Sequence, residues 1–398
     1  MMKRVVCIVL ISLGMVWILS FALSPDGVQS RIFQHVFTPW FGDFFINRVI
    51  WNAPCPYEGF GMTPAHEVIY PLFAHWVLTF FPNSFIGGVI HSVMGSVFLL
   101  FSLSVFLWRR MGNVSLWLRV LMLSACFCSQ QMFYVFERSN QVIFAVGMVV
   151  LFLAWYDSTR VHERFLAAFA LAVAAALKVS PALFGLFYFV PMFERDRRQV
   201  DWFFISLCSV SAVVLIFGPF WWHGEGFVEI ERLCRNVAKN GSGTSWGGVA
   251  LYRELSFVGL LPSGFPFRVA RFTNVILGVL GLIASVLPRS SGIRTCDRLL
   301  FLVSAIMLLP TTSCAYVALY LFPVFIMVDA NDWKMCVLWL ALFLPLQIPT
   351  ELMLNVSGLT LNPTISNFAF LGLLSMAYCR LVIRICHLSG LSSEMPTS

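Results

Sequence analysis

The chain has 398 residues, of which 59% are hydrophobic and 11% are charged, and its formal net charge is +7 at pH 7. A charged share of less than half the usual value of about 25% excludes a soluble globular enzyme. A nucleic-acid-binding protein would gather its Lys and Arg on one solvated face, whereas here they mark the ends of apolar runs. These proportions predict an integral membrane protein that forms one domain over residues 1–398 and has no nucleic-acid partner.

Apolar runs that can cross or enter a bilayer recur along the whole chain. A helical crossing needs about 20 apolar residues, and shorter runs fit short or broken helices. We therefore predict an all-α, polytopic bundle of about 10–12 transmembrane segments that includes short broken helices. The expected segments are residues 5–23, 84–108, 114–136, 141–156, 165–193, 202–222, 269–287, 299–309, 316–328, 335–351 and 368–384.

Basic residues set the expected orientation of this bundle. Lys3 and Arg4 precede the first run, which is too long for the core of a signal peptide and lacks a small-residue cleavage site. By the positive-inside rule both termini are expected in the cytoplasm of a multi-pass inner-membrane protein. Two long segments, residues 24–70 and 223–268, then lie on the non-cytoplasmic side. They are the places where a site on that side would form.

Lys178 is the most unusual charge in the sequence. It lies in an otherwise uncharged stretch, residues 165–193, whose two ends are both basic, so a hairpin of two short helices is expected there. Pro181 disfavours helix at the residue before it, which puts the reversal at 178–181. A lysine at membrane depth costs about 2.5–3.5 kcal/mol on insertion scales. Either it reaches the surface or pairs with a structural carboxylate, or it binds a phosphate at the mouth of a cavity.

A second polar group, Glu137, Arg138, Ser139 and Asn140, forms a short turn between two apolar runs. Solvent capping alone requires none of these side chains. They form either an ion pair at the membrane interface or one wall of the same polar cavity.

The first outer segment sets a carboxylate among aromatic rings. Asp43 lies within Trp40–Phe45, and Trp51, Tyr57 and Phe60 follow. Rings cover the apolar faces of a sugar while a carboxylate takes a hydroxyl proton, so this composition suits a sugar-handling site. Aromatic residues also gather at bilayer surfaces. Both interpretations remain open on composition alone.

The outer segments hold three further features. His66 and Glu67 lack a second helical histidine, so no zinc site is expected. Residues 227–239 place apolar side chains on one stripe, as in an amphipathic surface helix. Cys55 and Cys234 are the clearly outer cysteines, and a disulfide between them is left open.

Taken together, these features resemble glycosyltransferase family 87, membrane enzymes of the GT-C superfamily that use polyprenyl-phosphate sugars. Asp43, Cys55–Tyr57 and Tyr70–Phe73 resemble the family's first-loop pattern. Glu137–Asn140 is similar to its acid-Arg-Gly-Asn turn, with Ser139 where glycine is usual, and Lys178–Pro181 matches its Lys-x-x-Pro signature.

Two later stretches match the family more loosely. Asn240–Ser245 resembles its Asn/Ser-rich outer segment, and Pro310–Tyr316 a Pro-x-x-Ser-x-x-Tyr pattern. The apolar neighbours Ala315 and Val317 depart from that pattern, so the resemblance does not identify the acceptor.

The resemblance implies transfer of a mannose-like hexose or a pentose from a polyprenyl phosphate to a glycan or glycolipid, with inversion, on the non-cytoplasmic face. Asp43 is then the expected base, and Lys178 and Arg138 bind the donor phosphate. Substrate-binding or orienting roles fall to Glu137, Asn140, Tyr70, Ser313 and Tyr316. No cofactor is expected, and a divalent metal is not required. The competing hypotheses are a transporter or flippase of lipid-linked sugars, and a structural membrane subunit, which leaves Lys178 unexplained.

Overall fold

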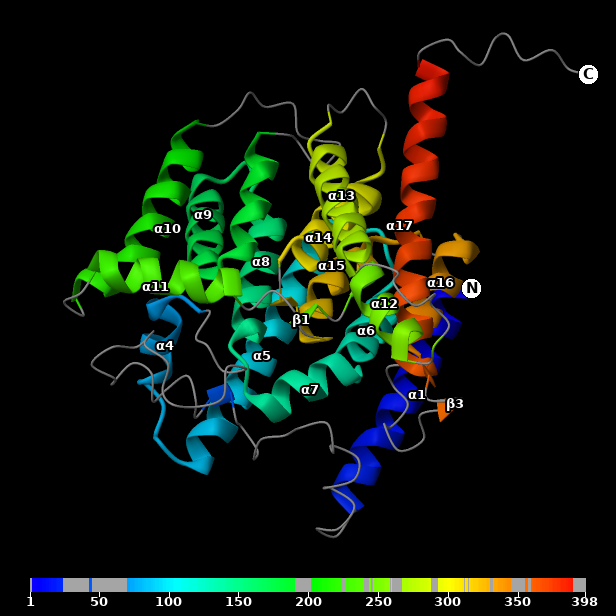
Figure 1. Cartoon of the computed structure of the whole chain (residues 1–398), viewed down its shortest axis with the longest axis horizontal. Helices are drawn as coiled ribbons and strands as arrows, with labels where there is room; N and C mark the ends of the chain where they lie inside the picture. The colour runs from blue at the N-terminus through cyan, green and yellow to red at the C-terminus, as the bar shows by residue number, and fades with distance from the viewer. Residues whose placement is uncertain are drawn as a thin grey trace, which may run out of the picture.

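The computed structural model of the protein is a bundle of helices with two very short β ladders (Figure 1). The described residues are 2–23, 43–44, 70–189, 202–222, 226–239, 243–244, 246–257, 259, 267–287, 293–310, 312–313, 315–329, 332–344, 355–356 and 359–388.

Helices account for nearly all of the described elements. The α-helices are α1 (Met2–Leu23), α4 (Leu72–Leu78), α5 (Phe85–Arg110), α6 (Leu116–Phe127), α7 (Gln130–Arg138), α8 (Val142–Trp155), α9 (Val161–Leu177), α10 (Trp202–Trp222), α11 (Gly226–Lys239), α12 (Gly247–Phe257), α13 (Phe267–Ser285), α14 (Thr295–Leu308), α15 (Leu321–Met327), α16 (Trp333–Phe343) and α17 (Leu361–Leu388). The 3-10 helices are η2 (Ser180–Tyr188) and η4 (Ala315–Tyr320). The strands are β1 (Gly243–Thr244), β2 (Thr312–Ser313), β3 (Asn355–Val356) and β4 (Leu359–Thr360).

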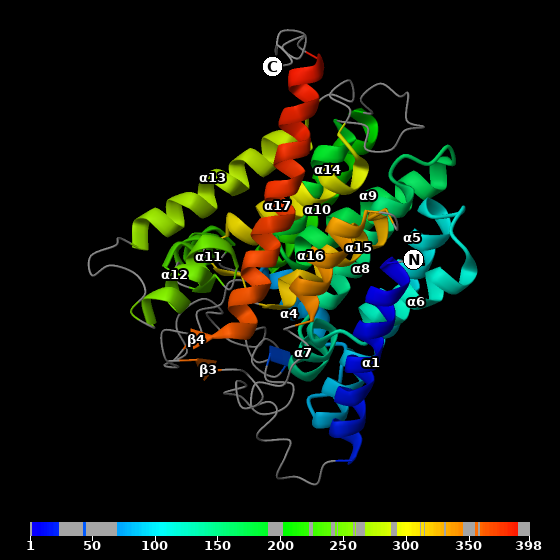
Figure 2. The ribbon, with the colours of Figure 1, turned by 90° about the vertical axis from the view of Figure 1, so that its right-hand side faces the viewer.

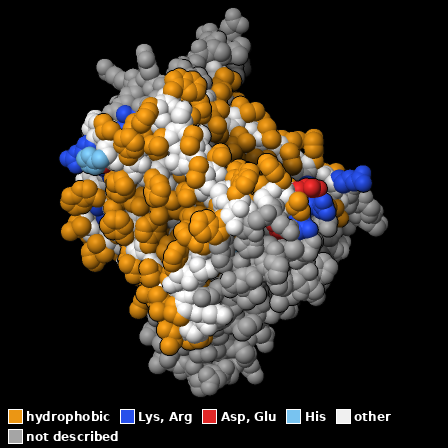
Figure 3. All heavy atoms as spheres, turned by 90° about the vertical axis from the view of Figure 1, so that its left-hand side faces the viewer, with side chains coloured by type: hydrophobic (Ala, Val, Ile, Leu, Met, Phe, Trp, Pro, Cys, Tyr) orange, Lys and Arg blue, Asp and Glu red, His pale blue; other side chains and the backbone are white. Residues whose placement is uncertain are grey.

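Four helices of the described part are long and apolar enough to cross a membrane, namely α5, α10, α13 and most of α17. Shorter apolar helices, among them α6, α8 and α16, lie between them. On the side of the molecule that carries α10, hydrophobic side chains cover most of the described surface (Figure 3). Val210, Val213 and Val214 of α10 are exposed there. An apolar surface of this kind suits lipid, and the fold is that of a polytopic helical membrane protein, as the sequence predicts.

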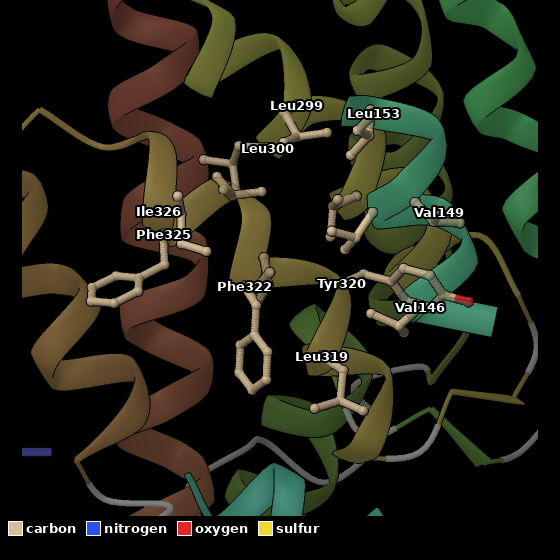
Figure 4. Packing of buried hydrophobic residues seen from close by; sticks show 14 of the residues in the cluster. Val146, Val149, Leu153, Leu299, Leu300, Leu319, Tyr320, Phe322, Phe325 and Ile326 are labelled. Carbon is tan, nitrogen blue, oxygen red and sulfur yellow. The ribbon is translucent and has the colours of Figure 1, made fainter. Parts of the chain in front are cut away.

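The core of the bundle is formed by helices that are apolar all round. Val146 and Val149 of α8 belong to the same buried cluster as Leu299 and Leu300 of α14, and Tyr320 and Phe322 lie beside them (Figure 4). Because these helices are covered on every side, their sequences show no amphipathic stripe. Figure 2 shows α17 alongside α16, with α14 behind it.

Two breaks interrupt the expected helices. Residues 114–136, predicted as one span, form α6 and α7 instead, so that prediction is wrong in its detail. The hydroxyl of Ser129 ends the first helix and begins the second: it donates to the Cys126 carbonyl (2.7 Å) and accepts from the Met132 amide (3.3 Å). The other break lies where the sequence places it, because α9 ends at Leu177 and η2 begins at Ser180.

The chain reverses at this second break. Gly185 of η2 lies beside Leu171 of α9, and Tyr188 contacts the rings of Phe152 and Tyr156 near the end of α8. The descending arm is a 3-10 helix, and Pro181 occupies its first turn. Lys178 is therefore at the tip of a hairpin.

The basic residues expected at the inner ends of the helices are held in ion pairs. Arg109 pairs with Glu163 (2.5 Å), and Arg110 pairs with Asp157 through two hydrogen bonds. Asp157 lies just past the last residue of α8, Trp155. These pairs mark one end of the bundle.

Two further groups belong to the inner ends expected from the sequence. Arg294 and Arg380 both donate to Asp297 at the start of α14 (3.0 and 3.1 Å). The buried ammonium of Lys3 donates to the carbonyls of Ile326 and Val328 (2.7 and 2.6 Å), at the end of α15. Lys3 thus satisfies carbonyl groups that a helix terminus leaves without a partner.

Candidate active site

Three polar residues that are distant from Asp43 in the sequence, Arg138, Asn140 and Tyr70, meet around it. Arg138 Nη2 lies 2.5 Å from Asp43 Oδ1, and Asn140 Nδ2 donates to Asp43 Oδ2 over 2.7 Å. Asn140 Nδ2 also lies 3.4 Å from the Tyr70 hydroxyl. The side chains of Asp43 and Arg138 are 14% and 19% exposed, so the ion pair is only partly buried. Of the residues singled out in the sequence, the structure brings Asp43, Arg138, Asn140 and Tyr70 together.

The end of α7 fixes two of these side chains. Ser139, the C-cap of α7, adopts the left-handed conformation with φ of 51°. For a residue with a Cβ this conformation costs about 1–2 kcal/mol, which glycine avoids. The amides of Ser139 and Asn140 donate to the carbonyls of Phe136 and Val135 (3.1 and 3.2 Å) and so close the helix end.

Asn140 connects this turn to the next helix. Its Oδ1 accepts from the Val142 amide over 2.9 Å, at the start of α8. The amide oxygen is therefore committed to the backbone, and the NH₂ group must face Asp43 and Tyr70. The side chain is fixed at both ends, which makes its contact with the carboxylate specific.

The carboxylate of Asp43 is held between a guanidinium and an amide. Arg138 contacts one oxygen of this carboxylate and Asn140 donates to the other. Arg138 and Asn140 thus orient the group and hold its negative charge in a partly buried place. The arrangement can act as a general base if the hydroxyl of an acceptor reaches an oxygen of this carboxylate.

Packing around α4 brings the tip of the α9–η2 hairpin to the same end of the bundle. Tyr70 precedes Pro71, the N-cap of α4. Phe73 of α4, Ala145 of α8 and Leu177 of α9 form one buried cluster, and Tyr70 packs against it. Lys178 directly follows Leu177, so its backbone leaves α9 at the cluster against which Tyr70 packs.

Lys178 itself occupies a break in the helix. It is the half-buried C-cap of α9, with an extended backbone (φ −156°, ψ 124°), and its amide donates to the Ala174 carbonyl over 3.0 Å. Irregular backbone at membrane depth occurs where it is buried in protein or lines a wet cavity. At this break Lys178 and Ser180 are half-buried and Val179 is exposed.

The two loosely matching stretches also meet. β1, from the second outer segment, pairs in parallel with β2, with Gly243 opposite Thr312 and Thr244 opposite Ser313. The 3-10 helix η4, which contains Tyr316, follows and packs against α7 and α8. The 3-10 helix η4 therefore lies beside α7, the helix that ends at Arg138. The side chains of Glu137, Ser313 and Tyr316 lie outside the described part of the structure, as does Cys55.

Three polar residues were not singled out in the sequence but hold this end of the bundle together. Asn274 of α13 accepts from the Gly248 amide (2.7 Å), Asn367 of α17 accepts from the Gly247 amide (2.7 Å), and His91 of α5 contacts Ser139. Gly247 has φ of 72°, and a Cβ there would lie 2.5 Å from Leu308. Each of these polar side chains lies in an apolar helix. A polar residue within an apolar run is visible in the sequence and could have been used to predict these positions.

The amphipathic helix expected at residues 227–239 is present as α11. Ile230 and Leu233 pack against Leu72 of α4 and Phe220 of α10. Its buried Glu229 pairs with Arg232. Its apolar stripe therefore packs on the start of α4 and the end of α10.

Within the described residues, no group of three or more His, Cys, Asp or Glu side chains is placed to hold a metal ion. The positive charges beside Asp43 and at the hairpin tip are those of the Arg138 and Lys178 side chains.

Comparison with known proteins decides the family. The model of glycosyltransferase family 87 matches residues 69–314, more than half of the chain. The chain belongs to glycosyltransferase family 87. It is thus a membrane glycosyltransferase, which the sequence motifs had indicated. The match includes Tyr70, Arg138, Asn140 and Lys178, whereas Asp43 lies before its first residue. A comparison with curated proteins gave no significant match.

Proposed function

We propose that this glycosyltransferase moves one mannose-like hexose or one pentose from a polyprenyl phosphate to a hydroxyl of a glycan or glycolipid. The observation that carries the proposal is the Asp43 carboxylate held between Arg138 and Asn140. Lys178 supports it, because it follows the end of α9 in the cluster against which Tyr70 packs. A carboxylate with adjacent cations supplies a base and a phosphate site together.

We infer the face on which this reaction occurs from the charges at the two ends of the bundle. α8 begins beside Asn140 and ends beside Asp157, so about 20 Å of helix separates the site from the Arg110 ion pair. The basic connections carry Arg109, Arg110 and Arg294 and belong in the cytoplasm by the positive-inside rule. The Asp43 site then opens on the non-cytoplasmic face of the inner membrane, and both termini are cytoplasmic.

In the proposed reaction, Asp43 accepts the proton of the acceptor hydroxyl. The hydroxyl oxygen attacks the anomeric carbon from the face opposite the phosphate, a new C–O bond forms, and the bond from the anomeric carbon to the phosphate oxygen breaks. The configuration inverts, the polyprenyl phosphate leaves with the bonding electrons, and the proton remains on Asp43 until it passes to water. No divalent metal is required, because the protein provides the cations.

Arg138 has two partners in this scheme. It contacts Asp43 in the absence of substrate, and the donor phosphate would lie between Arg138 and Lys178. Negative charge on the phosphate grows as the sugar departs, so fixed cations stabilise the transition state more than the ground state. Asn140 keeps Asp43 in place while Arg138 contacts the phosphate.

A direct assay tests the proposed function. The purified protein is supplied with polyprenyl-phosphate mannose or a polyprenyl-phosphate pentose, radiolabelled in the sugar, and with the glycolipid fraction of cells that lack the protein. We expect the label to move to glycolipid with release of one polyprenyl phosphate for each sugar transferred. Intact donor that crosses a proteoliposome bilayer without transfer would instead identify a flippase and overturn the proposal.

Lys178→Met should lower kcat/KM for the donor by about 10- to 100-fold. The substitution keeps the alkyl stem but removes a charged hydrogen bond to the phosphate, and such bonds contribute about 1.5–3 kcal/mol. Steady-state kinetics with varied donor measure the effect, and Lys334→Met, at an exposed position on α16, is the control. Wild-type kinetics for Lys178→Met would mean that this lysine only reaches toward the membrane surface.

A further inference from the structure

A buried histidine touches both segments that form the active site. His91, in the second turn of α5, is fully buried, and its ring centroid lies 5.6 Å from that of Phe44 and 5.1 Å from that of Phe144. Phe44 directly follows Asp43, and Phe144 lies in the first turn of α8. Phe81 packs against the same imidazole at 5.0 Å. One side chain therefore contacts the segment of the base and the helix that follows the Arg138 turn.

His91 also makes a hydrogen bond to that turn. Its Nδ1 lies 2.8 Å from Ser139 Oγ, which lies 3.2 Å from the Gly88 carbonyl oxygen. A carbonyl oxygen can only accept, so the single hydroxyl hydrogen of Ser139 points to Gly88. Nδ1 of His91 must then carry the proton and donate it to Ser139. The contact selects one tautomer of the ring.

This hydrogen bond acts on the strained residue of the site. Ser139 has positive φ, which a residue with a Cβ adopts only where its surroundings hold it. Its neighbours, Arg138 and Asn140, are the two residues that donate hydrogen bonds to Asp43. If Ser139 relaxed toward negative φ, these two side chains would no longer point at the same carboxylate.

We propose that His91 is a positioning residue for sugar transfer, which holds Ser139 in the left-handed conformation and keeps Arg138 and Asn140 on Asp43. The proposal rests on the proposed function of Asp43 as base. Histidine is suited to this place because it fills the space between three aromatic rings and still offers a hydrogen-bond donor. Leucine would lack the donor, and serine would leave a void beside Phe44.

Two substitutions separate the ring from the donor. His91→Phe keeps the aromatic packing and removes the hydrogen bond, and we expect kcat to fall by about 10- to 100-fold, as for a small misplacement of a catalytic group. His91→Asn places an amide nitrogen near the position of Nδ1, and kcat should recover to within about threefold of wild type. Ser102→Ala, a buried change elsewhere in α5, controls for folding of that helix.

Glycine at position 139 provides the decisive test. Because glycine adopts positive φ without strain, the double variant His91→Phe/Ser139→Gly should recover most of the kcat lost in His91→Phe. A purely structural role of His91 would give the same loss in both backgrounds and would overturn the inference. Wild-type kcat in His91→Phe would also overturn it.

Asp43→Asn, assayed in parallel, keeps the two proposals distinct. If Asp43→Asn is inactive and His91→Phe is fully active, only the positioning role of His91 is contradicted. If Asp43→Asn is active, Asp43 is not the base, and the positioning role of His91 is contradicted as well.

Discussion

Asp43→Asn is expected to lower kcat for sugar transfer by about 10²- to 10⁴-fold, the usual contribution of a general base. Asparagine has nearly the same shape but cannot take the proton of the acceptor hydroxyl. The hydroxyl must then attack without losing its proton, which raises the barrier. The measurement is the rate of labelled glycolipid formation at saturating donor.

The substitution also disturbs a contact, which calls for a matched control. In Asp43→Asn, one of the two donors that face the side chain, Arg138 Nη2 or Asn140 Nδ2, meets an NH₂ group instead of an oxygen. Asp157→Asn creates the same problem for Arg110, in an ion pair of similar burial (8% and 11% exposed side chains). Both variants should lose thermal stability in detergent. Only Asp43→Asn should lose transfer, and equal rates for the two would contradict the role of Asp43.

Donor binding should survive the loss of the carboxylate. Removing a negative charge close to an anionic phosphate leaves its binding unchanged or tightens it. Inhibition by polyprenyl phosphate without sugar should therefore be at least as strong in Asp43→Asn as in wild type. Markedly weaker inhibition would mean that Asp43 belongs to the donor site and not to the acceptor side.

Most helix positions could be predicted because they depend on local signals. Residues 202–222 were expected as a span and form α10 with the same bounds, and residues 84–108 correspond to α5. Apolar runs of this length have few alternatives to helix in a membrane. The Lys178–Pro181 break could also be predicted, since proline acts on the residue immediately before it.

The break at Ser129 could not be read from hydropathy. The run from Val114 to Phe136 is apolar enough for one helix, and a single serine within it is ordinary. What ends α6 is the geometry of the Ser129 hydroxyl, which bonds to the chain on both sides. Serine in a helix more often bonds back to the previous turn without breaking it, as Ser96 does in α5.

The candidate site could be predicted residue by residue but not as an arrangement. The sequence separately indicated Asp43, Arg138 and Asn140. Arg138 and Asn140, however, lie 95 and 97 residues after Asp43 in the chain, so the sequence did not show that they meet. No local pattern shows that one guanidinium would contact the base and not only a lipid phosphate. His91 was missed because an isolated histidine in an apolar helix is usually a packed core residue, and its partner is 48 residues away.

The pairing of Arg138 with Asp43 leads to the second large effect. Arg138→Gln should lower kcat/KM for the donor by about 10²- to 10³-fold, similar to the loss of one fixed donor that faces a developing negative charge. Arg138→Lys should retain part of the activity, because it keeps the charge but loses the planar fork that can face a carboxylate and a phosphate together. Arg110→Gln, which breaks the Asp157 pair at the other end of the bundle, is the control for stability.

Inhibition by polyprenyl phosphate separates the two partners of Arg138. If the guanidinium contacts the phosphate, Arg138→Gln weakens this inhibition by about tenfold or more, whereas Asp43→Asn does not. In the double variant, kcat should stay near that of Asp43→Asn, since a cation that orients the base has nothing left to orient, while inhibition should follow Arg138→Gln. Unchanged inhibition in Arg138→Gln would contradict the phosphate contact and leave Arg138 with Asp43 alone. Binding of the donor phosphate would then depend on Lys178 alone, and Lys178→Met should show the full loss of donor affinity.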